Sequence, residues 1–317
     1  MATIEEHRAA VESRINQWCG SLPKGELYAP MEYLLRLPAK RVRPIATLMA
    51  CELMGAEADR AIDAALGIEL FHNFTLMHDD IMDASPTRRG RPTVHVRWGQ
   101  NLAILSGDAL LVKAYQCMGA DARALAVFNS CALQVCEGQE LDMAFERAAS
   151  ITAEQYMHMI RRKTAVLLAC ALEVGAIIGG ASPGQQQAIA RFGEQLGLAF
   201  QLRDDHIDAF GDPAVSGKQR GGDLRAGKKT WLLIRGLELE RACGGGTLTK
   251  AMGQMSIARE VSDMVEALIA LGVRDESEAL IRGMETEALA ALDSVDVPAE
   301  RRAPLRALAM GLMGRTS

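Results

Sequence analysis

The sequence has few aromatic side chains and no run of β-branched residues that would predict a strand. Phe, Trp and Tyr together make up 4% of its 317 residues. Ala, Leu, Met and Glu are abundant instead, and these residues favour helix. The formal net charge is only −5, which argues against a protein that binds nucleic acid through a basic surface. We therefore expect an all-α protein without a nucleic-acid partner.

Paired cysteines and an export signal are also missing. The seven cysteines form no Cys-x-x-Cys pair, so we interpret them as buried thiols in a reducing compartment. The first residues lack the apolar core of a secretory signal. The most membrane-like stretch, residues 164–181, contains Glu173 and several glycines, which favours a helix buried in a bundle. These features predict a cytoplasmic location and no membrane span.

The apolar pattern predicts helices that follow one another with short breaks. Helices are expected over residues 44–53, 57–83, 101–118, 121–147, 152–178 and 183–210, and again after the glycines at 244–246. Pro and Gly interrupt a basic stretch at residues 84–92, which predicts a loop there. We find no repeat and no linker long enough to divide the chain, so a single domain over residues 1–317 is expected.

The most informative feature is an acidic pattern that occurs twice. Asp-Asp-x-x-Asp begins at Asp79 and again at Asp204, each time beside a largely apolar, helix-like segment. Residues four apart lie on one face of a helix, so Asp79 shares a face with Asp83. Asp204 shares one with Asp208 in the same way. Mg²⁺ accepts such carboxylates and completes its shell with water and phosphate oxygens. Carboxylates beside apolar surface are costly without compensation, and we interpret both motifs as metal sites for a phosphorylated substrate.

Basic residues accompany the acidic motifs. Arg88 and Arg89 follow the first motif within a few residues, and Lys218 and Lys228 follow the second on loops whose glycines allow close backbone approach. A third cluster at residues 40–43 precedes a helix, whose N-terminus favours anions. Acid, loop and base therefore occur twice in the same order. This order favours a site that binds two phosphorylated groups.

With these residues the chain resembles the trans-isoprenyl diphosphate synthases, the head-to-tail polyprenyl synthetases that include farnesyl and geranylgeranyl diphosphate synthases. The resemblance extends over residues 40–231. Its motifs are Lys40-Arg41-x-Arg43-Pro44, His72, the run from His78-Asp79-Asp80 to Arg88-Arg89-Gly90, Gly138-Gln139-x-x-Asp142, Lys163-Thr164, Gln201-x-x-Asp204-Asp205-x-x-Asp208, Gly217-Lys218 and Gly227-Lys228. The family implies a barrel of long antiparallel helices around a deep central cavity, and a homodimer.

The resemblance also implies the roles of individual residues. The Mg²⁺ ligands would be Asp79, Asp83, Asp204 and Asp208, for three ions in each active site. The allylic diphosphate would contact Arg88, Lys163 and Lys228, with Lys218 nearby. Isopentenyl diphosphate would bind, without metal, to Lys40, Arg43, His72 and Arg89. Thr164 and Gln201 would face the allylic cation, and Asp142 would support the metal shell. The family pattern needs no direct role for His206.

The chemistry implied is ionisation of the allylic C–O bond, with metal and cations stabilising the departing diphosphate. The isopentenyl double bond then attacks the carbocation and a proton is lost. Three other interpretations share Mg²⁺ binding: a class I terpene cyclase, a non-catalytic subunit of a heteromeric synthase and a Mg²⁺ phosphohydrolase. A cyclase would not need the second diphosphate-binding set, and a non-catalytic subunit often loses aspartates that this chain retains. A hydrolase needs a general base beside a water, and the sequence indicates none.

The length of the product is expected to depend on the helix that ends in the first motif. Phe74 lies five residues before Asp79, about 7.5 Å along the axis, and Phe71 shares its face. In the family an aromatic residue at the position of Phe74 goes with short products, and a second one beside it with fifteen carbons. Here the neighbour is Thr75 and the motif has no two-residue insertion. We predict Phe74 as the main stop, with a product of fifteen to twenty carbons and a preference for twenty.

Overall fold

The computed structural model describes residues 2–119, 121–212 and 220–314. These residues group into two compact units. Unit 1 comprises residues 1–130, 170–189 and 295–305, and unit 2 comprises residues 131–169, 190–294 and 306–317. The all-α class predicted from the sequence is confirmed. The single domain stays a prediction. No helix in the described ranges is long and apolar enough to cross a membrane.

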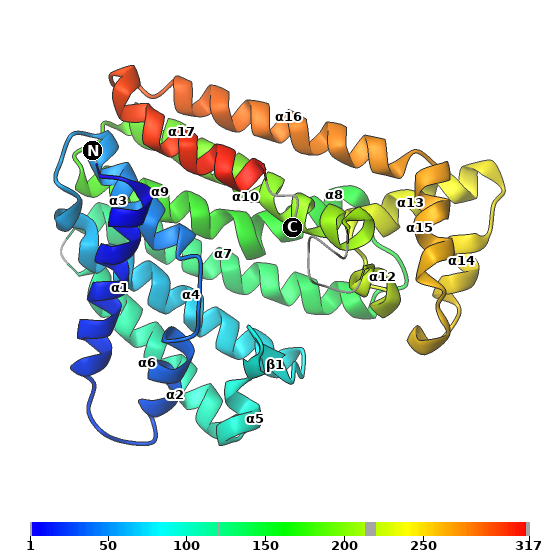
Figure 1. Cartoon of the computed structure of the whole chain (residues 1–317), viewed down its shortest axis with the longest axis horizontal. Helices are drawn as coiled ribbons and strands as arrows, with labels where there is room; N and C mark the ends of the chain where they lie inside the picture. The colour runs from blue at the N-terminus through cyan, green and yellow to red at the C-terminus, as the bar shows by residue number, and fades with distance from the viewer. Residues whose placement is uncertain (1, 120, 213–219, 315–317) are drawn as a thin grey trace. The chain divides into compact units, whose positions relative to one another are not determined.

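Unit 1 contains the N-terminal helices and the only strands found in the described residues (Figure 1). Its elements are α1 (Ile4–Gly20), α2 (Ala29–Leu35), α3 (Val42–Leu53), a 3₁₀ turn (Ala58–Ala61), α4 (Ile62–Met82), β1 (Thr87–Arg88), β2 (Arg91–Pro92), α5 (Val94–Trp98) and α6 (Gln100–Met118). Helix α4 is buried on every side from Ala64 to Phe71, which is typical of a helix at the centre of its unit.

Unit 2 contains the later helices. They are α8 (Ala153–Ile160), a π-helical turn (Arg161–Ala165), α12 (Gly222–Ala226), α13 (Trp231–Cys243), α14 (Thr247–Met252), a 3₁₀ turn (Ser256–Ala258), α15 (Val261–Ala270) and α16 (Val273–Asp293). The remaining helices contribute residues to both units: α7 (Ala122–Arg147), α9 (Val166–Ile178), α10 (Pro183–Phe210) and α17 (Ala299–Met313).

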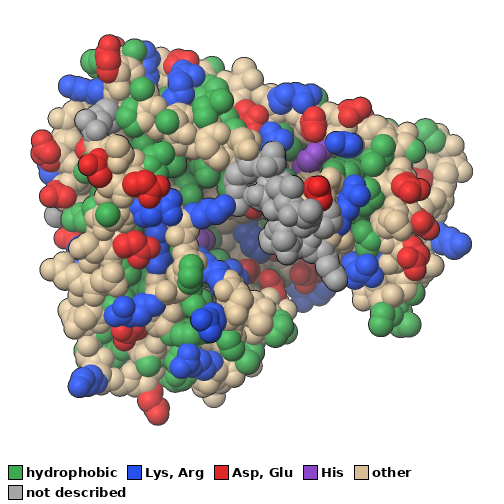
Figure 2. All heavy atoms as spheres, viewed as in Figure 1, with side chains coloured by type: hydrophobic (Ala, Val, Ile, Leu, Met, Phe, Trp, Pro, Cys, Tyr) green, Lys and Arg blue, Asp and Glu red, His purple; other side chains and the backbone are tan. Residues whose placement is uncertain are grey.

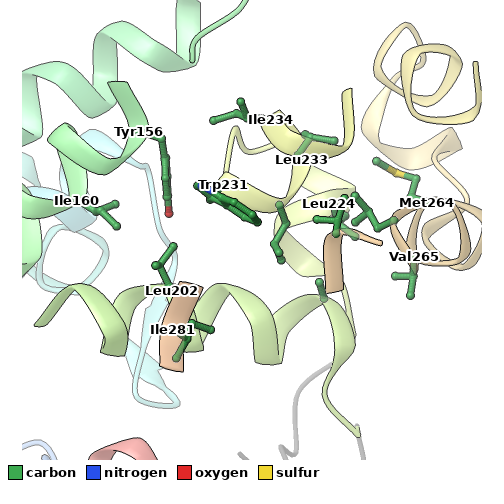
Figure 3. Packing of buried hydrophobic residues seen from close by; sticks show 14 of the residues in the cluster. Tyr156, Ile160, Leu202, Leu224, Trp231, Leu233, Ile234, Met264, Val265 and Ile281 are labelled. Atoms are coloured by element: carbon green, nitrogen blue, oxygen red, sulfur yellow. The ribbon is translucent and has the colours of Figure 1, made fainter. Parts of the chain in front are cut away.

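Buried apolar side chains form the core of unit 2. Tyr156, Leu202 and Trp231 come from three different helices and pack in this core (Figure 3). On the outside, Lys and Arg side chains are interspersed with Asp and Glu over the face shown in Figure 2. The mixture of both signs agrees with the small net charge of −5.

Three sequence predictions need correction. Residues 84–92 are not only a loop, because Arg88 pairs with Arg91 in a two-stranded antiparallel ribbon. Residues 152–178 are not one α-helix, because a π-helical turn interrupts them at Arg161–Ala165. Cys136 and Cys243 are exposed rather than buried. The ribbon is a local hairpin with a two-residue turn at Arg89 and Gly90. The π turn packs closely against Gly138 and Gly197, and apolar periodicity does not report such packing.

Candidate active site

Both Asp-Asp-x-x-Asp motifs lie at the C-terminal ends of long helices. Helix α4 ends at Met82, and the backbone N–H of Asp83 donates to the carbonyl of Asp79 at 2.9 Å. The second motif occupies the last turns of α10. The C-terminus of a helix carries a partial negative charge, so carboxylates add to an unfavourable potential there. Each helix end therefore needs compensating cations, which agrees with the interpretation of the motifs as cation sites.

Arg88 supplies a positive charge to the first motif. Its Nε donates to Oδ2 of Asp80 at 2.8 Å, and its Nη2 lies 3.7 Å from Oδ2 of Asp79. The side chain of Asp80 is 3% exposed, whereas that of Asp79 is 21% exposed. Sequence reasoning gave Asp80 no role. The middle aspartate of the motif anchors the arginine, and Asp79 is the more accessible carboxylate.

A tight hairpin places Arg88 and Arg89. Arg89 and Gly90 form its two-residue turn with φ of 52° and 72°, the positive values that a type I′ turn requires. Gly90 adopts this conformation at no steric cost, whereas Arg89 is a non-glycine residue in the left-handed region and is strained by about 1–2 kcal/mol. Strain of this kind is typical of functional sites. The hydroxyl of Thr93 donates to the carbonyl of Ser85 at 2.8 Å and closes the base of the hairpin.

Arg43 and His72 lie together, as the sequence predicted for one substrate site. Nη1 of Arg43 is 3.3 Å from Nε2 of His72. Burial, and then the positive charges of Arg43, Arg89, Arg88 and Arg41, hold the pKa of His72 well below its usual range. The imidazole is therefore neutral near pH 7 and accepts through Nε2 from the guanidinium. So many cations around one neutral histidine favour an anionic ligand.

Arg41 is buried between the exposed Lys40 and the half-buried Arg43. Its backbone has a φ of 50°, and its guanidinium donates to carboxylate oxygens of Glu12 at 2.8 Å and Glu69 at 2.6 Å. The side chains of Arg41 and Glu69 are 1% and 2% exposed. This buried ion pair anchors the segment that carries the two predicted substrate cations.

In unit 2 the π-helical turn positions Lys163 and Thr164. Gly138 of α7 packs against this turn so closely that an added Cβ would lie 2.3 Å from the backbone nitrogen of Lys163. Gly197 of α10 approaches it similarly, with 2.7 Å from an added Cβ to Cα of Ala165. Single π turns inside α-helices are frequent at functional sites. The two glycines explain how two helices can approach the widened turn.

The side chains around the π turn pair as the sequence motifs suggest. Nζ of Lys163 donates to Oδ2 of Asp142 at 2.6 Å. The hydroxyl of Thr164 donates to Oε1 of Gln201 at 3.3 Å. Asp142 therefore contacts Lys163, a residue predicted to bind the allylic diphosphate. Whether it also supports a metal shell stays a prediction.

The middle aspartate of the second motif, Asp205, is buried and bonded to protein groups. The hydroxyl of Tyr156 donates to its Oδ2, and Nε2 of Gln201 donates to Oδ1 at 3.1 Å. Burial raises the pKa of Asp205 to about 7, although Tyr156, Lys228 and Gln201 act to lower it. In Figure 3 the hydroxyl of Tyr156 is directed toward α10. Asp205 therefore holds α10 to α8, and no sequence signal identified Tyr156 as its partner.

The outer aspartates of the second motif differ in exposure. Asp204 is exposed and Asp208 is half-buried. Oδ2 of Asp208 accepts from the backbone N–H of Asp223 at 3.0 Å, and its carbonyl accepts from Gly221 at 2.6 Å. Asp208 thus contacts the N-terminal turn of α12. Its role as a Mg²⁺ ligand stays a prediction, as does that of Asp204.

Lys228 follows the second motif on an exposed loop. Desolvation lowers the pKa of its ammonium, but the carboxylates of Asp223, Asp205 and Asp142 outweigh this effect and raise the pKa above the ordinary value. The ammonium is therefore charged near pH 7. Lys218, the other predicted cation of this region, lies outside the described residues.

The residues predicted to set the product length lie in an aromatic cluster of unit 1. The Phe74 ring is 5.5 Å from that of Phe71 and 4.8 Å from that of His78. Phe71 packs edge to face on Phe128 of α7, with centroids 5.2 Å apart. Phe71 is fully buried and Phe74 is 8% exposed. The hydroxyl of Thr75 donates to the carbonyl of His72 at 2.8 Å. The sequence did not indicate Phe128.

Comparison with known proteins gives consistent results. The family model described as polyprenyl synthetase matches residues 24–269. A short chain isoprenyl diphosphate synthase from Methanothermobacter thermautotrophicus is 39% identical over 244 residues, which are 75% of each chain. The crystal structure of a geranylgeranyl pyrophosphate synthase superposes with a TM-score of 0.94 at 37% identity and covers 100% of both chains. A geranylgeranyl pyrophosphate synthase from Corynebacterium glutamicum, solved with isoprenyl diphosphate and magnesium, gives a TM-score of 0.87 at 31% identity, covering 99% of this chain and 100% of that one.

Proposed function

The chain belongs to the polyprenyl synthetase family and is a prenyltransferase, and from this premise we propose that it condenses isopentenyl diphosphate head-to-tail with allylic diphosphates. The observation that carries the proposal is the cluster of Arg43, Arg88 and Arg89 around the neutral His72, at the carboxylate-bearing end of α4. A diphosphate is the kind of anion that such a cluster favours.

We assign isopentenyl diphosphate to Lys40, Arg43, His72 and Arg89. Two features support this assignment. The neutral imidazole of His72 accepts from Arg43 and so orients a guanidinium whose fork suits phosphate oxygens. The left-handed backbone of Arg89 places its side chain at the tip of a hairpin. Together these residues provide fixed positive charge that needs no metal.

We assign the allylic diphosphate to Arg88, Lys163, Lys228 and Lys218. The described members of the set are each held near a carboxylate, as the bond from Lys163 to Asp142 illustrates. A cation that is already positioned loses little entropy when it binds a phosphate.

The carboxylate oxygens of Asp79, Asp83, Asp204 and Asp208 fit the hard-oxygen preference of Mg²⁺. Among the described residues no group of three or more His, Cys, Asp or Glu side chains forms a metal cage, so we propose that substrate oxygens complete the shell. When bound, Mg²⁺ would neutralise charge on the leaving diphosphate. Three ions for each active site is part of the same proposal.

The reaction follows from these groups. The allylic C–O bond breaks, and both of its electrons leave with the diphosphate, which the bound cations stabilise. The π electrons of isopentenyl diphosphate form the new C–C bond. Loss of a proton to the released diphosphate then restores a double bond. Thr164 and Gln201, which are joined by a hydrogen bond, are assigned to the region of the allylic cation.

We propose a product of fifteen to twenty carbons, with geranylgeranyl diphosphate favoured. Phe74 is the main stop in this proposal because it is the less buried of the two rings that precede Asp79. The Phe71 ring packs against that of Phe74 and is itself held by contact with Phe128. Thr75 is too small to close the cavity itself.

Replacing Phe74 by alanine should lengthen the product by at least one isoprene unit, because removal of the ring opens space along α4. Chromatography and mass analysis of the dephosphorylated products measure the change. Phe74→Leu retains part of the bulk and should give a smaller shift. An unchanged product distribution from Phe74→Ala would contradict the assignment of this residue as the stop.

We also propose a homodimer and a cytoplasmic location. The homodimer is supported by exposed apolar side chains on α6, namely Leu105 and Val112, which are 57% and 56% exposed. Sedimentation equilibrium should give twice the chain mass of 34.2 kDa. The location rests on the absence of cysteine pairs, and fractionation of the source cells measures it.

The proposed function is tested with purified protein, Mg²⁺, isopentenyl diphosphate and, separately, dimethylallyl, geranyl and farnesyl diphosphates. After dephosphorylation we expect prenyl alcohols that are longer than the primer. Chelation of the metal should abolish their formation. A cut-off at fifteen carbons would favour a farnesyl diphosphate synthase. Cyclic hydrocarbon made without isopentenyl diphosphate would favour a class I terpene cyclase and overturn the proposal.

A further inference from the structure

Lys229 fastens the loop that carries Lys228 to the end of α7. Its Nζ donates to the carbonyls of Phe145 and Glu146 at 2.9 and 3.0 Å. Helix α7 ends at Arg147, so these carbonyls belong to its last turn, where backbone acceptors lack intrahelical donors and a positive charge is favoured. Two of the three ammonium donors of Lys229 are therefore used by the protein.

Arg259 holds the same loop from another segment of unit 2. Its Nη1 donates to the carbonyl of Arg225, near the end of α12, at 2.7 Å, and its Nε donates to the carbonyl of Ala251 at 3.2 Å. The guanidinium lies against Gly227, where an added Cβ would be 2.5 Å from Nη1. Gly227 also has a φ of 74°, a left-handed backbone conformation that favours glycine.

The backbone between these two contacts is fixed as well. The N–H of Lys228 donates to the carbonyl of Asp223 at 2.9 Å, and the N–H of Thr230 donates to the carbonyl of Lys228 at 2.8 Å. Thr230 is 2% exposed and precedes α13. Lys228 is thus an exposed side chain on a restrained backbone. A pocket of about 300 Å³ lies beside it, with Asp142 and Tyr156 in its lining.

We propose that Lys229 and Arg259 are positioning residues that hold the Lys228 ammonium ready for the allylic diphosphate. The inference rests on the proposed function, which assigns that diphosphate to Lys228. Helix α7 also carries Asp142, the partner of Lys163. Lys229 therefore fastens the Lys228 loop to the helix whose Asp142 positions Lys163. The spacing of the Lys163 and Lys228 ammonium groups is set before substrate binds. Preorganised charge of this kind is more effective than charge that must be ordered during the reaction.

Lys229→Met keeps the length of the side chain and removes its donors. In the Mg²⁺-dependent elongation assay, kcat/KM for geranyl diphosphate should fall by roughly ten- to a hundred-fold, the effect of a misplaced ligand. The KM for isopentenyl diphosphate should not change, because its assigned residues belong to unit 1. Lys229→Arg retains a cation and should recover most of the activity. Lys24→Met, at an exposed lysine between α1 and α2, is the matched control and should behave as the parent protein.

A double-mutant cycle separates positioning from general destabilisation. If Lys229 acts through Lys228, the Lys228→Met/Lys229→Met protein should be no worse than Lys228→Met alone. Arg259→Met should give the same pattern with Lys228→Met. The inference would be overturned if the activity loss of the double variant were the product of the losses of the two single variants. It would also be overturned if Lys229→Met raised the KM values for geranyl diphosphate and isopentenyl diphosphate equally.

The cycle also separates the positioning role of Lys229 and Arg259 from the assignment of Lys228 to the allylic diphosphate. A normal KM for geranyl diphosphate in Lys228→Met would contradict the assignment of Lys228 to the allylic diphosphate. A raised KM for geranyl diphosphate in Lys228→Met, together with normal kinetics in Lys229→Met and Arg259→Met, would contradict only the positioning role.

Discussion

Asp79→Asn and Asp204→Asn should each lower kcat by roughly a hundred- to a thousand-fold, because each removes one carboxylate that we propose as a Mg²⁺ ligand beside the leaving diphosphate. The substitutions are isosteric. Both side chains reach solvent, since that of Asp79 is 21% exposed and Asp204 is exposed, so the fold should tolerate the substitutions. Steady-state rates at saturating substrates measure the effect, and circular dichroism checks the fold. Additional Mg²⁺ should restore part of the activity.

The buried neighbour provides a matched control within the second motif. Asp205→Asn should cost much less activity than Asp204→Asn, because Asp205 is 4% exposed and already bonded to Tyr156 and Gln201. An asparagine can keep both contacts, because its Oδ1 can accept from Nε2 of Gln201 and its Nδ2 can donate to the hydroxyl oxygen of Tyr156. Equal losses at the two positions would mean that burial does not separate a ligand from a structural carboxylate in this motif. Activity within ten-fold of the parent in Asp79→Asn would contradict the metal assignment of the first motif.

Arg41→Met should destabilise the protein by about 3–5 kcal/mol, because it leaves Glu69 as an uncompensated buried charge. Glu69 is 2% exposed, whereas the second partner, Glu12, is 40% exposed and can turn to water. The folded fraction of the Arg41→Met variant should also show a raised KM for isopentenyl diphosphate, since Arg41 anchors the segment that contains Lys40 and Arg43. Urea unfolding followed by circular dichroism measures the first effect, and steady-state kinetics the second.

Removal of the unpaired negative charge of Glu69 tests why Arg41→Met destabilises the protein. Arg41→Met combined with Glu69→Gln should be more stable than Arg41→Met alone, because the glutamine is neutral and still accepts from Nδ2 of Asn73, which lies 2.9 Å from Oε1 of Glu69. If the double variant is the less stable of the two, the loss comes from packing around the arginine stem and not from the buried carboxylate.

The helices were predictable where their signals are local. Residues 183–210 were expected as a helix and form α10 with these bounds, and the helix expected over 121–147 is observed as Ala122–Arg147. Periodic apolar residues, a proline at the start and glycines at the ends suffice for such a prediction. The π turn at Arg161–Ala165 was missed. Its extra residue is accommodated by Gly138 and Gly197, which are distant in sequence.

The site was predictable as a set of residues but not as a set of contacts. The family motifs named the cations and carboxylates, and Arg43 with His72, or Lys163 with Asp142, indeed lie together. The sequence assigned metal roles to Asp204 and Asp208 and none to Asp205, but it did not show what the buried Asp205 contacts. Its partner is Tyr156, whose hydroxyl bonds to Asp205 across 49 residues of sequence.

By itself, the sequence determined an all-α protein of this family, with two carboxylate motifs at helix ends and basic residues after each. Helix propensity and spacing act over a few residues, so these features need no knowledge of the fold. Tertiary structure alone decided which charges are held and by what: Arg88 by Asp80, Arg41 by Glu69, and the Lys228 loop by Lys229 on the last turn of α7. Such pairs depend on the packing of distant segments, because a buried charge is stable only where the fold brings its partner.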